Sequence, residues 1–349
     1  MEIRTLNTLR ALAAFIVLIT HFSDATDWLD GSLGGRAGQY GVMLFFMLSG
    51  FLISHLYLDK RFSQNNLKHY LVARIARVLP LYFIVVFASY MSQQTGSDVL
   101  FSIDDGHILL GHVLFIYGES VLWSIAPEIH FYLLFIVIWY LTAWRTGYLY
   151  LIVASALILL FFANFPRPVG EWFGVHYDFH IFRSLPYFLV GLILGKHYKS
   201  ARTPEYLKSH WFLLALLLIP VMYPEFSPIT SDARRRMWLS YEVLFVFTAM
   251  FYSTVYLVPD NNIILANRIG DFMGKISYSL YLLHMPILWQ VNKLELTNEI
   301  KLGIFITLSV LCAYLSYTVI ERPLANMIRR PASNKRDAVD GPPCSTTGH

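Results

Sequence analysis

The sequence is poor in charged residues and in cysteine. Of its 349 residues, 14% are Asp, Glu, Lys or Arg, whereas a soluble domain averages about 25%. Only two cysteines occur, Cys312 and Cys344, so neither a disulfide framework nor a cysteine-rich metal motif is indicated, and no metal site is expected. The net charge of +4 is small and gives no argument for binding nucleic acid. An ordinary soluble domain is therefore excluded.

What the sequence has instead is long apolar runs, and 56% of its residues are hydrophobic. Ten runs are long enough, or nearly so, to cross a membrane core of about 30 Å. They cover approximately residues 7–23, 40–58, 78–92, 124–143, 147–163, 183–199, 211–223, 241–258, 277–292 and 303–320. Lipid offers no partner for open backbone groups, and the runs lack strand-like alternation. We therefore predict an all-α membrane protein with about ten transmembrane helices.

The distribution of Lys and Arg predicts the orientation. An even number of spans puts both termini on one side, and the segments rich in Lys and Arg then place that side in the cytoplasm. The exception is Arg234-Arg235-Arg236, which either has a task outside or shows that the seventh run is not a full span. We predict one transmembrane domain over residues 1–327. Residues 328–349 are rich in Pro, Ser, Thr and charge and are predicted to form a disordered cytoplasmic tail.

The first run carries a cation and an imidazole on one helical stripe. Arg10 and His21 are eleven residues apart, which at about 100° per residue brings them within roughly 20° of one another. They are separated by about 16 Å along the axis, so they face the same neighbours at two depths. Geometry alone fits a channel for a long ligand, a proton path or a helix-pairing site.

Two arginines follow the second run in a basic segment. Arg74 and Arg77 are three residues apart, so they share a helix face and can present two guanidinium forks to one phosphate-rich group. The alternative is topological. Juxtamembrane basic clusters are expected on the cytoplasmic side, and charge alone favours that explanation.

The fourth run contains a carboxylate near its start. Ser124, Glu128 and Tyr132 align at helical spacing. A carboxylate inside an apolar run costs about 2.5–3.5 kcal/mol at mid-membrane, so it normally has a cavity or a partner. Glu128 fits either a group that orients a base or a sugar hydroxyl, or an interfacial acid satisfied by water.

Polar stripes also occur in the ninth and second runs. Ser277, Tyr281 and His284 fall on one side of a helix and all can form hydrogen bonds, which favours a lined cavity over a simple joint between helices. In the second run, Ser49 and Gly50 let a neighbouring helix or a ligand approach the backbone, and helix packing is the favoured explanation. The last run ends at Glu321-Arg322-Pro323, where proline is predicted to stop the helix.

Taken in order, these motifs resemble acyltransferase family 3, the integral-membrane O-acyltransferases, over about residues 5–325. Each motif alone is weak, but six in the family's order are specific. The matching stretches are Arg10 with His21, Gly41 through Phe51, Arg74-Ile75-Ala76-Arg77, Trp123-Ser124 with Glu128 and Phe131-Tyr132, Ser277 through His284, and Glu321-Arg322-Pro323.

The resemblance implies a multi-pass protein of the bacterial cytoplasmic (inner) membrane. It implies acyl-CoA, usually acetyl-CoA, as a cytoplasmic co-substrate, with no permanently bound cofactor. The acceptor implied is a hydroxyl of a surface polysaccharide, a lipopolysaccharide or a lipid-linked oligosaccharide. Membrane lipids are the other expected partners, and nucleic acid is not one.

These observations lead to a hypothesis for the site. His21 and Glu128 would be catalytic, with His21 as general base, because an unperturbed imidazole pKa of about 6.5 leaves it mostly neutral. Arg74 and Arg77 would bind the donor phosphates and Arg10 would guide the donor. The supporting residues would be Ser49, Gly50, Phe51, Trp123, Ser124, Tyr132, Ser277, Tyr281 and His284.

The rival prediction is a transporter or flippase whose buried Arg, Glu and His line a path for substrate or protons. Composition and charge alone favour it. Transporters often show inverted-repeat symmetry, and we find no such repeat in this sequence.

Overall fold

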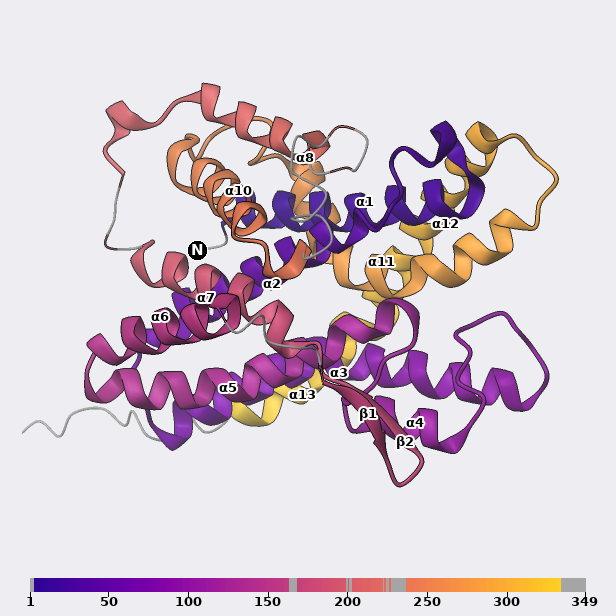
Figure 1. The fold of residues 1–349 in the computed structure, drawn as a ribbon, viewed down its shortest axis with the longest axis horizontal. Coiled ribbons are helices and arrows are strands. Elements are labelled where there is room, and N and C mark those ends of the chain that lie inside the picture. The colour runs from indigo at the N-terminus through magenta and orange to yellow at the C-terminus, as the bar shows by residue number, and fades with distance from the viewer. Residues whose placement is uncertain are drawn as a thin grey trace, which may run out of the picture.

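The protein is mostly helical. We describe it from a computed structural model, in residues 3–162, 168–198, 200, 203–221, 223, 226 and 237–333. Figure 1 shows most of the long helices running roughly along one direction. The connections after α2 (Gly38–Ile53) and α5 (Ile125–Trp144) lie at one end of this bundle, and the β-hairpin lies toward the other.

The remaining helices fill in the bundle and its connections. They are α1 (Arg4–Thr26), α3 (Gln64–Gln94), α4 (Gly106–Val113), α6 (Gly147–Phe162), α7 (Ile181–His197), α8 (Leu218–Val221), α10 (Tyr241–Tyr252), α11 (Arg268–Asn292), α12 (Asn298–Ser316) and α13 (Arg322–Ser333). Single π-helical turns extend α2, α10 and α12 over Ser54–Leu58, Ser253–Leu257 and Tyr317–Glu321. Strands β1 (Val169–Trp172) and β2 (Val175–Asp178) form the antiparallel hairpin, with Val169 opposite Asp178.

Five helices in the described part of the chain are long and apolar enough to cross a membrane. They cover Arg4–Thr26, Gly38–Leu58, Gln64–Gln94, Ser120–Trp144 and Asn298–Arg329. Shorter apolar helices cover Gly147–Phe161 and Tyr241–Leu257. These elements confirm the coarse prediction of an all-α membrane protein.

Helix starts follow local capping chemistry. Ser63 precedes α3 and its hydroxyl accepts from the backbone N–H of Asn66 at 3.3 Å. Asn267 caps α11 in the same way, with Gly270 N–H as donor at 2.6 Å. Each cap satisfies a backbone N–H that the first helical turn leaves without a partner.

The Ser63 cap changes the predicted position of the two arginines. Because α3 begins at Gln64 rather than near residue 78, the loop that follows Leu58 is short and Arg74 and Arg77 lie well inside a helix. The apolar run marks only the apolar part of this helix, since its first turns are polar. Arg74 is consequently buried, with 8% of its surface exposed.

Two other predicted boundaries also differ. Pro323 does not stop the last helix, because the π-helical turn Tyr317–Glu321 joins α12 to α13 and Pro323 falls in the first turn of α13. A proline is tolerated there because the widened π-helical turn before it relieves the clash between the proline ring and the preceding carbonyl.

The seventh run is not a regular α-helix of spanning length in the residues described. It forms a 3-10 helix, His210–Leu217, followed by the four-residue α8. Pro220 lacks the N–H that a longer helix would need. The Arg234-Arg235-Arg236 triplet and residues 334–349 of the predicted tail lie outside the described residues.

Close helix pairs form the centre of the fold. Helix α2 packs along α7, and α1 packs along α11. A Cβ at Gly50 would overlap the backbone carbonyl of Phe188, so glycine is needed for the approach of α2 to α7. The predicted helix-packing role of Gly50 therefore agrees with its position.

Candidate functional site

Helices α1 and α11 run parallel and hold a fixed register. Near their N-terminal ends, Asn7 Nδ2 donates to Asp271 Oδ1 at 2.7 Å. Near their C-terminal ends, Asn292 Nδ2 donates to the carbonyl of Ala25 at 3.1 Å. This register brings His21 beside a polar residue of α11.

That residue is His284. Nδ1 of His21 lies 2.9 Å from Nε2 of His284, and the two rings are nearly parallel, with centroids 5.2 Å apart and an interplanar angle of 7°. His284 is fully buried. The predicted Arg10–His21 stripe thus meets the predicted Ser277–His284 stripe along one helix pair.

The hydrogen bonds assign the hydrogen positions of this histidine pair. The carbonyl oxygen of Tyr281 can only accept, so Nδ1 of His284, 2.7 Å away, carries the hydrogen that it receives. With both rings neutral, Nε2 of His284 is then an acceptor, and Nδ1 of His21 donates to it. Nε2 of His21 therefore carries a lone pair, as a general base requires, and has no hydrogen-bond partner in the part of the chain that the structure describes.

A small cavity of about 50 Å³ lies near the histidine pair. Tyr281 lines it, and the ring centroids of Tyr281 and His284 are 5.9 Å apart, but neither histidine is a lining residue. The lining comes from α1, α2, α3, α5 and α11, and from the 3-10 turn before α5. The lining residues are Arg10, Val42, Phe45, Phe46, Ser49, Arg77, Val78, Ser124, Ile125, Glu128, Ser277, Tyr278 and Tyr281. Seven residues predicted for the site are therefore brought to one cavity.

Glu128 is the acceptor of two hydrogen bonds in this cavity. Oε1 receives one from Ser49 Oγ at 3.1 Å and one from Tyr132 Oη at 2.5 Å. The backbone carbonyl of Tyr132 accepts in turn from Tyr70 Oη at 2.9 Å. These bonds fix the carboxylate, and the group that orients His21 is His284 rather than Glu128.

Cations gather around the carboxylate. Arg10 interacts electrostatically with Arg77, Arg74 and Glu128. The guanidinium of Arg74 lies 6.0 Å from the centroid of the Tyr132 ring, and its Nε has no hydrogen-bond partner in the part of the chain described. A buried guanidinium with an unsatisfied N–H is costly, so this arrangement favours an anionic ligand.

Five predicted supporting residues are not in the cavity lining. Two of them contact lining residues, Tyr132 through Glu128 and His284 through Tyr281, and the other three are Gly50, Phe51 and Trp123. Gly50 contacts α7, and Phe51 packs in the core against Phe251, with ring centroids 5.5 Å apart. Trp123 lies under the Arg183 guanidinium, 4.8 Å from its ring centroid. Their positions indicate structural roles.

The hydroxyls of Ser124, Ser277 and Tyr281 are bound to backbone carbonyls. They donate to Val121 at 3.1 Å, Gly274 at 2.9 Å and Val121 at 3.0 Å, respectively. The cavity wall is thus held by the chain itself.

The sequence interpretation gave Glu321 no role in the site. Oε2 of Glu321 accepts from Ser279 Oγ at 2.9 Å, and Glu321 interacts electrostatically with Arg77 and Arg10. Its place in the Glu321-Arg322-Pro323 motif was the available signal. In the described residues, no group of three or more His, Cys, Asp or Glu could hold a metal ion.

Fold and site together define a multi-helix membrane protein with a buried cavity lined by arginines and a carboxylate. A family model described as an acyltransferase domain matches residues 3–320. The chain therefore belongs to acyltransferase family 3, as the order of its motifs predicts.

Curated relatives of this chain include proteins of Staphylococcus aureus. A protein of strain COL, provisionally named as an O-acetyltransferase, is 25% identical over 361 residues, which cover 91% of this chain and 56% of the relative. The O-acetyltransferase OatA of strain NCTC 8325 / PS 47 is 25% identical over 354 residues, with the same coverage. The chain thus spans slightly more than half the length of these relatives. No solved structure matches it.

Proposed function

We propose that this chain is an O-acyltransferase of the bacterial inner membrane. It moves an acyl group, in the first instance acetyl, from cytoplasmic acyl-CoA to a saccharide hydroxyl. The family and the names of the relatives support the reaction class. The observation that carries the proposal is the His21–His284 pair, which orients His21 and which contacts, through the Tyr281 ring, a cavity lined by Arg10, Arg77 and Glu128.

The arginines supply the donor end of the site. The buried region contains more positive than negative side chains. Its arginines are Arg10, Arg74 and Arg77, and its carboxylates are Glu128 and Glu321. This excess of positive charge favours binding of an anion, and planar guanidiniums suit the phosphates of CoA. Because Arg74 and Arg77 lie inside α3, the phosphates must enter beyond the inner rim of the protein.

His21 carries the chemistry. Its Nε2 takes the proton of the acceptor hydroxyl as that oxygen attacks the thioester carbonyl. The new C–O bond forms, the C–S bond breaks, and the CoA thiolate leaves and receives the proton from His21. This direct transfer needs only one base, whereas an acyl-histidine intermediate would use the same Nε2 as nucleophile.

Glu128 and the cavity wall position the reactants. Because Ser49 and Tyr132 already donate to Glu128 Oε1, its other oxygen is the one to hold an acceptor hydroxyl. The cavity has room for about two water molecules, so side chains must move when the acyl arm enters. Helical walls then keep bulk water from hydrolysing the thioester.

We also propose the membrane arrangement predicted from the sequence, with about ten spans and both termini in the cytoplasm. The five spanning helices and the parallel α1 and α11 support it. In this orientation Arg74 and Arg77 lie nearer the cytoplasmic side and His21 nearer the outer side. The acceptor then reaches His21 from the membrane or the outer face.

The test uses membranes from cells with and without this chain, incubated with labelled acetyl-CoA. We expect label in the saccharide or lipid-linked saccharide fraction only when the chain is present. Movement of a saccharide across the membrane without covalent labelling would contradict the proposal and favour the transporter.

A further inference from the structure

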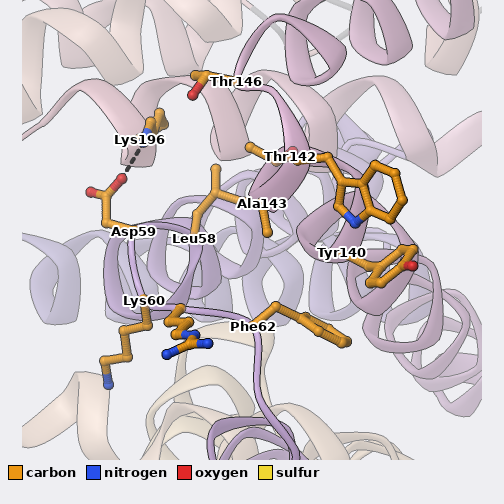
Figure 2. A pocket seen from close by; sticks show the side chains of 11 residues that line it. Leu58, Asp59, Lys60, Phe62, Tyr140, Thr142, Ala143, Thr146 and Lys196 are labelled. Carbon is orange, nitrogen blue, oxygen red and sulfur yellow. Dashed lines mark hydrogen bonds and ion pairs between the residues drawn. The ribbon is translucent and has the colours of Figure 1, made fainter.

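A second, larger cavity of about 450 Å³ opens at the end of the bundle where α2 and α5 terminate. We call it the inner pocket. Figure 2 shows its lining, which includes three cations, Lys60, Arg61 and Lys196, and the aromatic residues Phe62, Tyr140 and Trp144. Ligand sites commonly measure about 300–1,000 Å³, so the inner pocket has room for a nucleotide and the cavity near His21 does not.

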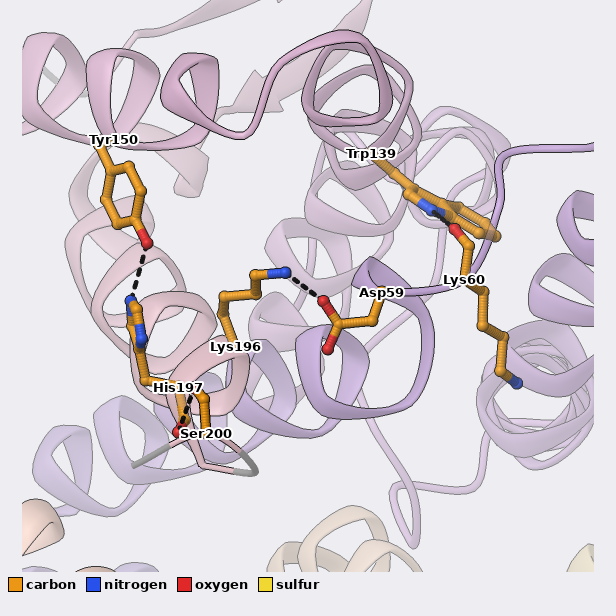
Figure 3. Close-up of polar contacts among 7 residues, drawn as sticks. All are labelled: Asp59, Lys60, Trp139, Tyr150, Lys196, His197 and Ser200. Atoms are coloured by element: carbon orange, nitrogen blue, oxygen red, sulfur yellow. Dashed lines mark hydrogen bonds and ion pairs between the residues drawn. The ribbon is translucent and has the colours of Figure 1, made fainter. Parts of the chain in front are cut away.

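The inner pocket is lined by more positive than negative side chains. Lys196 of α7 donates to Asp59 at the end of α2, as Figures 2 and 3 show. In the described part of the chain, no carboxylate pairs with Lys60 or Arg61. Lys60 Nζ lies instead 4.8 Å from the centroid of the Tyr57 ring. Two cations therefore remain for an anionic group.

The backbone that carries these two cations is held in place. Trp139 Nε1 donates to the carbonyl of Lys60 at 2.9 Å (Figure 3), and Asn66 Nδ2 donates to the carbonyl of Arg61 at 2.9 Å. A pre-formed segment loses little conformational freedom on binding, which favours a ligand site over a mobile basic loop.

The aromatic residues give the pocket a flat apolar side. The ring centroids of Phe62 and Tyr140 are 5.3 Å apart, and those of Tyr140 and Trp144 are 5.9 Å apart. Trp144 is 71% exposed and Tyr140 44%. Exposed aromatic rings are common at membrane interfaces, but rings that share a concave site with free cations are suited to a purine base and its phosphates.

A line of cations joins the inner pocket to the cavity near His21. Both Lys60 and Arg74 contact the Tyr57 ring, with Lys60 Nζ 4.8 Å and the guanidinium carbon of Arg74 6.0 Å from its centroid. Arg74 also lies beside Tyr132, whose hydroxyl donates to Glu128. A long ligand with phosphates in its middle could contact both sites at once.

We propose that the inner pocket binds the 3′-phosphoadenosine end of acyl-CoA. Lys60 and Arg61 hold the 3′-phosphate, and the aromatic residues stack on adenine. The diphosphate passes Arg74, and the pantetheine arm continues to His21. This inference rests on the proposed use of acyl-CoA, and it adds a nucleotide site to it.

The first measurement is direct binding of adenosine 3′,5′-bisphosphate by calorimetry to the full chain in discs of zwitterionic lipid. We expect the double variant Lys60→Gln/Arg61→Gln to bind at least tenfold more weakly than the wild type. Lys68→Gln removes the same kind of charge from the exposed face of α3 and should bind as the wild type does. Absent binding by the wild type, or equal binding by the double variant, would overturn the proposal.

A kinetic measurement separates this proposal from the proposed function. The double variant should raise KM for acetyl-CoA about tenfold and leave KM for acetyl-pantetheine, which lacks the nucleotide, unchanged. If the wild type transfers acetyl groups and the double variant has an unaltered KM for acetyl-CoA, the nucleotide site is wrong and the function stands. If no transfer occurs but bisphosphate binding depends on Lys60 and Arg61, the nucleotide site stands and the function is wrong. Retention of anionic lipid that depends on these two residues, without bisphosphate binding, would identify a lipid headgroup site and overturn the proposal.

Discussion

At the scale of single residues, the basicity of His21 depends on which of its nitrogens carries hydrogen. The carbonyl of Tyr281 orders His284, and His284 orders His21. If His21 is the base, as we propose, His284 is a positioning residue, because it fixes the tautomer of His21. An imidazole with the other tautomer would present an N–H to the acceptor hydroxyl and could not take its proton.

This account predicts different results for two substitutions of His284. His284→Phe removes the acceptor for His21 Nδ1–H and should lower kcat at least tenfold with KM for acetyl-CoA unchanged. His284→Gln can still accept through its side-chain oxygen and should retain more activity than His284→Phe. Equal kcat values for both variants and the wild type would show that the pair has no role in positioning.

A second histidine outside the spanning helices gives a pH prediction. His112 of α4 is fully buried, and burial lowers its pKa from the ordinary 6.5 to about 4. Its Nε2 accepts from the backbone N–H of Glu119 at 3.1 Å, which requires the neutral ring. The stability that it contributes is therefore complete above about pH 6.5 and is lost as the pH falls toward about 4.

We expect hydrogen exchange in residues 106–119, corrected for the intrinsic rate, to increase over that pH range. The variant His112→Gln should lack the increase, because glutamine does not titrate. Protection of this segment in the wild type that stays constant from pH 7 to about 4 would contradict the assignment.

At the scale of elements, the site depends on the close approach of α1 and α11. A Cβ at Gly274 would overlap the backbone of Asn7, next to the Asn7–Asp271 hydrogen bond that sets the register. The same register places His21 beside His284 further toward the C-terminal ends of the two helices. A change that separates these helices should disturb both stability and the histidine pair.

The variant Gly274→Ala tests this dependence. Added volume at a tight contact lowers the free energy of unfolding by about 1–3 kcal/mol. We therefore expect the detergent-solubilised variant to lose its monodisperse peak at a lower midpoint temperature than the wild type. Gly303→Ala in α12 is the matched control, because nothing lies within 4 Å of a Cβ there. Equal midpoints for both variants would show that the approach of α1 to α11 is not tight.

Much of each element could be predicted from the sequence, because apolar runs and helical spacing are properties of one segment. The Arg10–His21 and Ser277–His284 stripes are examples. The contact between the stripes could not be predicted, since it depends on side chains 263 residues apart and on helix register. The burial of Arg74 was missed because a polar helical start looks like a loop when only hydrophobic runs are considered.

At the scale of the whole molecule, orientation decides which cavity meets which reactant. If both termini are cytoplasmic, the inner pocket faces the cytoplasm and the hairpin of β1 and β2 faces outward. In a background without cysteine (Cys312→Ser, Cys344→Ser), Phe173→Cys in the fully exposed hairpin turn should react with an impermeant maleimide in intact cells. Asn65→Cys near the start of α3 should react only after permeabilisation, and the reverse pattern would contradict the orientation.

The central claim is that Nε2 of His21 is the base for acyl transfer, and the most direct measurement compares two histidine substitutions. Wild type, His21→Ala and His197→Ala are purified in lipid discs and supplied with labelled acetyl-CoA and bacterial saccharide extract. His197 lies at the end of α7. Among the described residues, its ring nitrogens have one hydrogen-bond partner, the hydroxyl of Tyr150. We predict no transfer above background by folded His21→Ala and a wild-type rate for His197→Ala. Transfer by His21→Ala at the wild-type rate would contradict the claim.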